Sequence, residues 1–96
     1  MREGYEELWA MLLEAFHQAS EGKGKERHAN DLPFMQQPVM QISRMVGPGF
    51  AAGQAMKKLQ EAIGMFQRGS NTAAERELLG AIVYTAATVL AIREGK

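Results

Sequence analysis

The chain of 96 residues contains no cysteine, which excludes thiolate catalysis, zinc–sulfur sites and disulfide cross-links. An excess of charge of one sign is also missing, because 11 basic and 11 acidic side chains cancel. A neutral chain has no overall field to attract nucleic acid or an anionic membrane. We therefore expect neither an extended nucleic acid nor a membrane as a partner. No secretion-signal pattern opens the sequence, so a cytoplasmic location is expected.

Enzyme motifs are absent as well. The sequence contains no Walker or dinucleotide-binding glycine pattern and no GxSxG elbow. Metal-dependent chemistry needs several carboxylates that converge on one point. The two helices expected in the C-terminal half offer only Glu61 on one, with Glu75 and Glu77 at the start of the other. We therefore predict a protein that is not an enzyme and that uses no metal or cofactor.

A long apolar stretch, residues 78–92, dominates the C-terminal half. It holds no charged residue, and its only polar side chains are those of Tyr84, Thr85 and Thr88. A helix that is apolar all round must be covered all round. The stretch is shorter than the roughly 17 residues that a membrane-spanning helix needs, so a buried core helix is expected. One short chain has few elements to cover it, which predicts a homo-oligomer.

Apolar residues recur at three- and four-residue steps over most of the chain, which is typical of amphipathic helices. The pattern predicts one all-α domain, residues 1–96, with helices at residues 3–20, 38–46, 50–67 and 72–93. The last two should form an antiparallel hairpin in a helical bundle, with the first helix packed across it. The residues expected to face inward are Tyr5, Leu8, Trp9, Leu12, Phe16 and Ala19 in the first helix, Val39, Ile42, Met45 and Val46 in the second, and Ala52, Met56, Leu59, Ile63 and Phe66 in the third.

Glycine, proline and threonine mark the expected helix ends. Gly22 and Gly69 are natural stops in the left-handed conformation, and the sequence Gly47-Pro48-Gly49 forces a turn. The sequence Thr72-Ala73-Ala74-Glu75 fits the capping-box pattern. It predicts that the last helix begins near Ala73.

Residues 21–37 are expected to form a loop, because their first half is polar and glycine-rich and lacks an apolar period. Loops of this length in small domains are mostly functional or disordered. This one gathers cationic side chains next to glycines, whose backbone N–H groups could point at an anion. The predicted ligand-binding residues are Lys23, Lys25, Arg27 and His28 for phosphate, Phe34 for stacking, Asn30 and Gln37 for selection, and Arg44 or Lys57 from a neighbouring subunit. The alternative is a solvated surface loop, which composition alone favours.

Several blocks of the sequence resemble small uncharacterised helical proteins of phages and prophages. The blocks are Glu26-Arg27-His28, Pro33-Phe34, Gln37-Pro38, Gly53-Gln54-Ala55, Lys57-Lys58, and Glu77-Leu78-Leu79-Gly80-Ala81-Ile82-Val83-Tyr84. The likeness covers residues 21–92. Small phage proteins of this helical build often counter host defence, some by trapping nucleotide-derived immune signals in oligomeric pockets. The resemblance implies an anti-defence protein in the cytoplasm of a bacterial host.

The C-terminal half is also similar in outline to the MazG-type all-α nucleoside triphosphate pyrophosphohydrolases. Members carry paired glutamates on one helix and a Glu-Leu-Gly-Asp-like start to the next. Here the sequence Glu77-Leu78-Leu79-Gly80-Ala81 places Ala81 near the position of the aspartate, and the preceding helix has only Glu61. The magnesium ligands of that family are missing, which argues against catalysis.

Three functions are consistent with the sequence. The first is a non-catalytic, oligomeric protein that sequesters a phosphorylated nucleotide-type ligand, for example a cyclic nucleotide or an ADP-ribose derivative. The second is a protein–protein inhibitor or adaptor that acts through an apolar helix face, with a methionine-rich surface from Met35, Met40 and Met45. The third is a degenerate nucleotide pyrophosphohydrolase.

Overall fold

The computed structural model describes residues 2–21 and 32–95. These residues form four α-helices and one 3-10 helix, and they contain no strand, so the predicted all-α class is confirmed. The elements are α1 (Glu6–Glu21), η2 (Phe34–Gln36), α2 (Pro38–Val46), α3 (Gly49–Gln67) and α4 (Asn71–Glu94).

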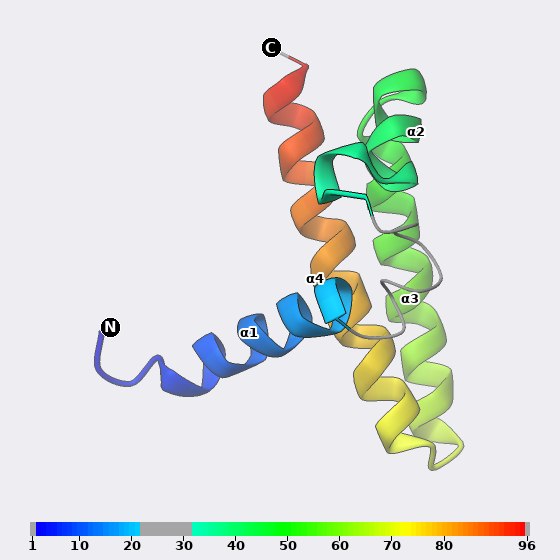
Figure 1. The fold of residues 1–96 in the computed structure, drawn as a ribbon. Helices are drawn as coiled ribbons and strands as arrows, with labels where there is room; N and C mark the ends of the chain where they lie inside the picture. Colours follow the sequence, from blue (N-terminus) through cyan, green and yellow to red (C-terminus); the bar gives the residue numbers. More distant parts are fainter. Residues whose placement is uncertain (1, 22–31, 96) are drawn as a thin grey trace.

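The long helices α3 and α4 run antiparallel and lie side by side (Figure 1). The short elements η2 and α2 cover the end of this pair at which α3 begins and α4 ends. Helix α1 meets α4 near the middle of the pair and projects away from it (Figure 1). We call α3 and α4 together the stem, and we call α1, which protrudes from it, the arm.

Two glycines with positive φ set the turns around α3. Gly47 has φ 102° between α2 and α3, and Gly69 has φ 83° after α3. The backbone N–H of Gly69 donates to the carbonyl of Phe66 at 3.0 Å, and that of Ser70 donates to the carbonyl of Met65 at 2.9 Å. This pair of bonds is the Schellman motif, which needs a left-handed residue at the position of Gly69. The predicted stop at Gly69 is confirmed.

Three predicted details of the helix ends are wrong. Helix α1 begins at Glu6 and not at residue 3, because Gly4 takes φ 88° and its N–H donates to the Glu6 carboxylate at 3.1 Å. Part of the predicted loop 21–37 is helical, since Glu21 ends α1 and η2 forms at residues 34–36. The capping box is not formed, because α4 already begins at Asn71 and its N-cap residue Ser70 makes no side-chain cap hydrogen bond. Gly22 lies outside the described residues.

Alanine supplies most of the buried core. The buried residues are Ala15, Met40, Ser43, Ala51, Ala55, Ala62, Ala74, Ala81, Ala87 and Ala91. Met40 is the one large side chain among the described residues that is fully buried. It lies in a cluster with Ala51, Ala87 and Ala91, against which Phe34, Met35, Val39, Tyr84 and Leu90 pack. Small side chains let α3 and α4 approach closely, but they remove little apolar surface from water.

Most side chains of the helix faces predicted to point inward are exposed, whereas Ala19, Val39, Ile42 and Ala52 are half-buried. Helix α3 packs through Ala51, Ala55 and Ala62, about 100° around the helix from the predicted stripe. In α2 the buried residues are Met40 and Ser43. The exposed members of the predicted faces are Tyr5, Leu8, Trp9, Leu12, Phe16, Met45, Val46, Met56, Leu59, Ile63 and Phe66. Complete coverage of residues 78–92 is also wrong within one chain, because Leu78, Val89 and Ile92 are exposed.

Candidate interaction surface

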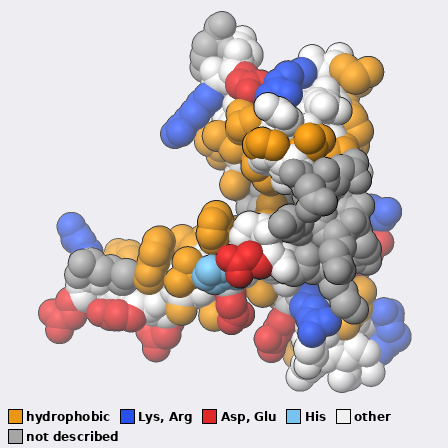
Figure 2. Space-filling model, viewed as in Figure 1, with side chains coloured by type: hydrophobic (Ala, Val, Ile, Leu, Met, Phe, Trp, Pro, Cys, Tyr) orange, Lys and Arg blue, Asp and Glu red, His pale blue; other side chains and the backbone are white. Residues whose placement is uncertain are grey.

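Among the described elements, α1 carries the most exposed large apolar side chains. Every large apolar side chain from Tyr5 to Phe16 is exposed, and Ala15 is the one buried residue of the helix. Trp9, the single tryptophan of the chain, is 51% exposed, and Phe16 is 60% exposed. Figure 2 shows hydrophobic side chains along one edge of the arm and acidic side chains along the other. Monomeric proteins rarely expose a continuous apolar face of this kind, which marks an interaction site.

Among the described residues, the arm is attached to the rest of the molecule through its C-terminal turns. Gln18 donates a side-chain hydrogen bond to the backbone carbonyl of Arg76 in α4 at 3.0 Å. Ala15 is buried, and Gln18, Ala19 and Ser20 are half-buried, whereas residues 2–14 are all exposed. The N-terminal turns of α1 thus present their apolar side chains away from their own stem.

A second apolar face runs along the outside of α3. Met56, Leu59, Ile63 and Phe66 are all exposed. They point to one side of the helix, next to the buried alanine face and not on it. We call these four residues the α3 stripe, and we call Tyr5, Trp9, Leu12 and Phe16 the α1 stripe.

Both stripes have the residue spacing of helix–helix interfaces. The α1 stripe advances by steps of four, three and four residues, and the α3 stripe by steps of three, four and three. Alternating steps of three and four residues give the a/d repeat of coiled coils and helix bundles. Each stripe is therefore suited to contact with another helix.

The polar side of α1 is acidic. The helix contains Glu6, Glu7, Glu14 and Glu21 and no lysine or arginine. Helices that lie in a membrane interface carry basic residues on their polar face, which anionic lipids attract. None of the helices within residues 2–21 and 32–95 is long and apolar enough to cross a bilayer. The composition of the arm favours a protein surface over a lipid surface.

Five of the nine predicted ligand-binding residues, Lys23, Lys25, Arg27, His28 and Asn30, lie outside the described residues. The other four are placed. Phe34 is half-buried and packs on the Met40 cluster, and Gln37, the N-cap residue of α2, donates to the backbone carbonyl of Leu32 at 3.0 Å. Neither Phe34 nor Gln37 presents an unengaged side chain to solvent.

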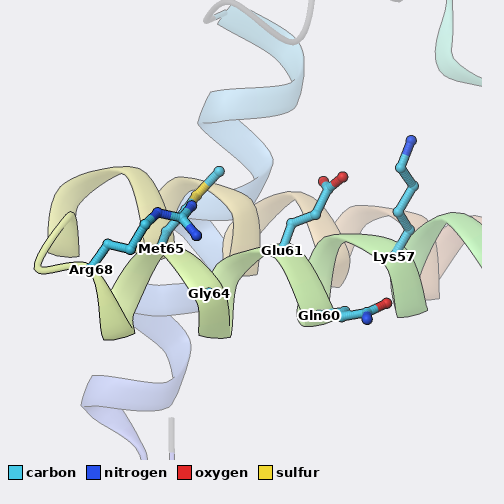
Figure 3. A pocket seen from close by; sticks show the side chains of 6 residues that line it. All are labelled: Lys57, Gln60, Glu61, Gly64, Met65 and Arg68. Atoms are coloured by element: carbon cyan, nitrogen blue, oxygen red, sulfur yellow. The ribbon is translucent and has the colours of Figure 1, made fainter.

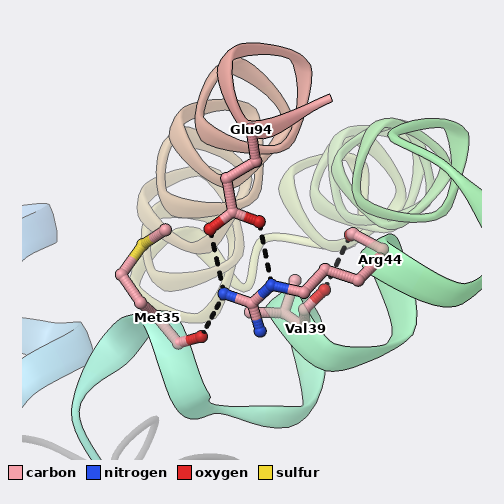
Figure 4. A network of polar contacts seen from close by, with 5 residues as sticks. Met35, Val39, Arg44 and Glu94 are labelled. Atoms are coloured by element: carbon pink, nitrogen blue, oxygen red, sulfur yellow. Dashed lines mark hydrogen bonds and ion pairs between the residues drawn. The ribbon is translucent and has the colours of Figure 1, made fainter. Parts of the chain in front are cut away.

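Arg44 is held by two partners on neighbouring elements (Figure 4). Its Nε and Nη2 atoms donate to the two carboxylate oxygens of Glu94 at 2.8 and 3.0 Å, and Nη2 also donates to the carbonyl of Met35 at 2.6 Å. The hydrogen bond from Arg44 holds the pKa of Glu94 below its usual value, and Glu94 in turn raises the pKa of Arg44. Arg44 joins α2, η2 and the end of α4, and is not a free phosphate ligand within the chain.

Lys57 lines a shallow hollow of about 660 Å³ on α3 (Figure 3). The described residues around it all belong to α3 or to its C-cap residue Arg68. No hydrogen bond or ion pair among the described residues connects Lys57 with Phe34, Gln37 or Arg44. The lining residues are Lys57, Gln60, Glu61, Gly64, Met65 and Arg68. Sequence reasoning missed Arg68, although its place eleven residues after Lys57 puts both on the same side of the helix, about 16 Å apart along its axis.

One further polar cluster joins α3 to α4. The Lys58 ammonium lies 3.4 Å from a Glu77 carboxylate oxygen and 5.7 Å from the centre of the Tyr84 ring. Burial, and then the charge of Glu77, raise the pKa of Tyr84. The aliphatic part of the Lys58 side chain passes over Gly80, where an added Cβ would lie 3.0 Å from Lys58 Cδ. Gly80 thus makes room for the Lys58 side chain.

Within the described ranges, no group of three or more His, Asp or Glu side chains could hold a metal ion. No protein-family model, curated protein or solved structure matches the chain. The resemblances to phage proteins and to the MazG-type family therefore stay predictions.

Proposed function

We propose that this protein is a non-catalytic interaction protein, which binds protein surfaces through the exposed apolar faces of α1 and α3 and works as a homo-oligomer. The proposal corresponds to the inhibitor or adaptor function among the three that the sequence allows. Its surface differs from the one expected, because Met40 is fully buried and Met35 is half-buried, which leaves Met45 as the exposed methionine of the three.

One observation carries the proposal. The fully buried side chains of the described part are alanines apart from Met40 and Ser43, whereas many of its large apolar side chains, including all of those on α1, are exposed. Folded proteins place large aliphatic and aromatic residues inside, because burial of each stabilises by about 1.5–3 kcal/mol. The leucine, phenylalanine and tryptophan side chains that this chain leaves exposed gain that stabilisation only when another surface covers them.

The α1 arm is the principal element of the proposed site. Aromatic residues dominate the energetics of protein interfaces, and α1 presents Tyr5, Trp9 and Phe16 on one stripe. The helix is already formed and attached at its C-terminal end. The free energy of binding to a partner is therefore not reduced by an entropy cost of ordering this helix.

A phosphorylated nucleotide is the second candidate ligand. The observation in its favour is that Lys57 and Arg68 line the same hollow on α3, which gives that surface two cationic groups against the single carboxylate of Glu61. The predicted contribution of Lys23, Lys25 and Arg27 to such a site stays a prediction. Sequestration of an immune signal would then occur at this second surface, and it would not depend on formation of the homo-oligomer.

The proposed function is tested by site-specific photo-crosslinking in cells that express the full chain. A photoreactive phenylalanine analogue replaces Leu12 on the α1 stripe or, as the matched control, Ala10 on the polar side of the same helix. We expect cross-links to protein from position 12 and few from position 10. No cross-linked protein from position 12, or equal cross-linking from both positions, would overturn the proposal.

A further inference from the structure

We propose that the α1 stripe of one copy packs on the α3 stripe of a second copy, and that the same contact forms twice around a twofold axis. This inference rests on the proposed function, because it names the partner of the same two faces. It makes the protein a dimer in which each arm lies along the other copy's stem.

The two stripes match in length and in spacing. From Tyr5 to Phe16 the helix advances about 17 Å, and from Met56 to Phe66 about 15 Å, at 1.5 Å per residue. Both are exposed along their whole length and both step by three and four residues. Side chains in this repeat interdigitate as knobs into holes when two helices pack at a small angle.

Charge favours the α1–α3 pairing over two copies of α1 side by side. Helix α1 carries four carboxylates and no cation, so an α1–α1 contact would bring two acidic helices together. Helix α3 has Lys57 and Lys58 against Glu61, and Arg68 follows it. An α1–α3 contact avoids this repulsion, because α3 carries no excess of negative charge, and the symmetric α1–α1 alternative is therefore disfavoured.

The chain exposes more surface than a folded monomer of its mass usually does. The accessible surface is 6836 Å². A folded monomer of 10.6 kDa exposes about 5,500 Å², so this chain exposes about 1,400 Å² more. A standard interface buries about 800 Å² per partner and obligate homodimers bury more. The excess is what a dimer contact of this kind would remove from water.

The extended shape of the molecule is consistent with a subunit of the proposed dimer. The radius of gyration of the Cα atoms is 14.0 Å, whereas a compact domain of this length has about 12.5 Å. The projecting arm in Figure 1 accounts for an extended outline. When an arm from each copy covers the other copy's stem, the contact closes on itself, as a twofold dimer requires, and no arm is left to recruit a third copy.

The first test is the mass and the tryptophan emission of the purified full chain. Light scattering should give twice 10.6 kDa, and the emission of Trp9 should be blue-shifted at concentrations at which the dimer forms and red-shifted on dilution. A monomer at every concentration, with the emission of an exposed tryptophan throughout, would overturn the inference. The homo-oligomer in the proposed function would then fail as well, whereas binding of protein surfaces through α1 would stand if position 12 still cross-links to another protein, and would fail if it does not.

The second test compares charged substitutions on and off the stripes. Leu12→Glu and Ile63→Glu should each raise the dissociation constant at least about thirtyfold, as loss of an interface hot spot does. Their controls, Ala10→Glu and Gln54→Glu, add the same charge to the same helices on the side away from the stripes and should change it less than threefold. Circular dichroism verifies that each variant stays helical, which is expected because Leu12, Ile63 and Ala10 are exposed and Gln54 is half-buried in the single chain. Equal effects of the stripe and control variants would contradict the inference.

The third test identifies which helices meet, and the absence of native cysteine makes it clean. Single cysteines replace Trp9, Leu12 or Phe16 in one sample and Leu59, Ile63 or Phe66 in another, and the nine mixtures are oxidised. Disulfide-linked dimers should form in at least one mixture and not from either parent alone, and Ala10→Cys mixed with Gln60→Cys should give none. A dimer by light scattering that forms no mixed disulfide, or that forms them only within the α1 set, would overturn the α1–α3 pairing.

Discussion

Arg44 and Glu94 face each other through two hydrogen bonds, from Nε to Oε1 at 2.8 Å and from Nη2 to Oε2 at 3.0 Å. The pair joins α2 to the last turn of α4, and the third bond of Arg44, to the carbonyl of Met35, adds η2 to the same junction. This junction closes the end of the stem around Met40. Several predictions about stability depend on it and on the alanine core beneath it.

Replacement of Glu94 by glutamine should reduce the acid sensitivity of the fold. The pKa of Glu94 is lower in the folded protein than in the unfolded chain, because Arg44 donates to it. Its contribution to stability is therefore fully present above the usual pKa of 4.5 and is lost as the pH falls through the lowered value. The melting temperature of the wild-type chain should fall more steeply in this window than that of Glu94→Gln. Glu75→Gln, at a position with no ion pair among the described residues, is the control and should follow the wild type.

Truncation of two methionines on the same helix should have very different effects. Met40 is 0% exposed, so Met40→Ala should lower the free energy of unfolding by about 2–5 kcal/mol. Met45 is 80% exposed, so Met45→Ala should change it by less than about 0.5 kcal/mol. Chemical denaturation with a helical readout measures both. Similar losses for the two variants would contradict the placement of α2.

The contact between Gly80 and Lys58 predicts a coupled pair of substitutions. Alanine is favoured over glycine in a helix by about 1 kcal/mol. In the wild-type chain, an added Cβ at Gly80 would lie 3.0 Å from Lys58 Cδ and would push this side chain away from Glu77 and Tyr84. Gly80→Ala should therefore stabilise the Lys58→Ala variant by about 0.5–1 kcal/mol more than it stabilises the wild type. A double-mutant cycle from denaturation curves measures this difference, and simple additivity would refute the contact.

Neutralisation of Lys23, Lys25 and Arg27 to glutamine separates the two candidate functions. Assembly through the helix stripes does not use these side chains, so the triple variant should keep the mass of the wild type in light scattering. A nucleotide site would use them. Calorimetry of the wild type against cyclic dinucleotides, ADP-ribose derivatives and nucleoside triphosphates should then show binding that the triple variant loses. Binding that both proteins show equally would remove these residues from the site.

The helices could be predicted from the sequence, but the faces through which they pack could not. A step of three or four residues places Met56, Leu59 and Ile63 on one side of α3, and that much is correct. The same helix carries a second periodic face, Ala51, Ala55 and Ala62, and this is the one that the stem buries. Periodicity identifies a face, but it does not say which face a chain buries itself and which one a partner would cover.

The candidate site shows a similar limit. Residue type marks Arg44 as a candidate phosphate ligand, but sequence distance hides that the carboxylate of Glu94, fifty residues away, already binds it. For α1 the sequence predicts the amphipathic helix, but the prediction that its apolar face packs on the rest of the chain is wrong. Sequence periodicity does not reveal that, among the described residues, α1 contacts α4 through its last turns.

The alanine interior has a consequence for the life of the protein in a cell. Because the stem is packed mainly through alanine, a single chain with an uncovered arm would have a small free energy of unfolding. A newly made chain without a partner would therefore unfold often and be degraded by proteases. Chains that assemble would be protected from degradation. The cellular concentration of the protein would thus rise steeply once its rate of synthesis exceeds a threshold, and would fall quickly when synthesis drops below it.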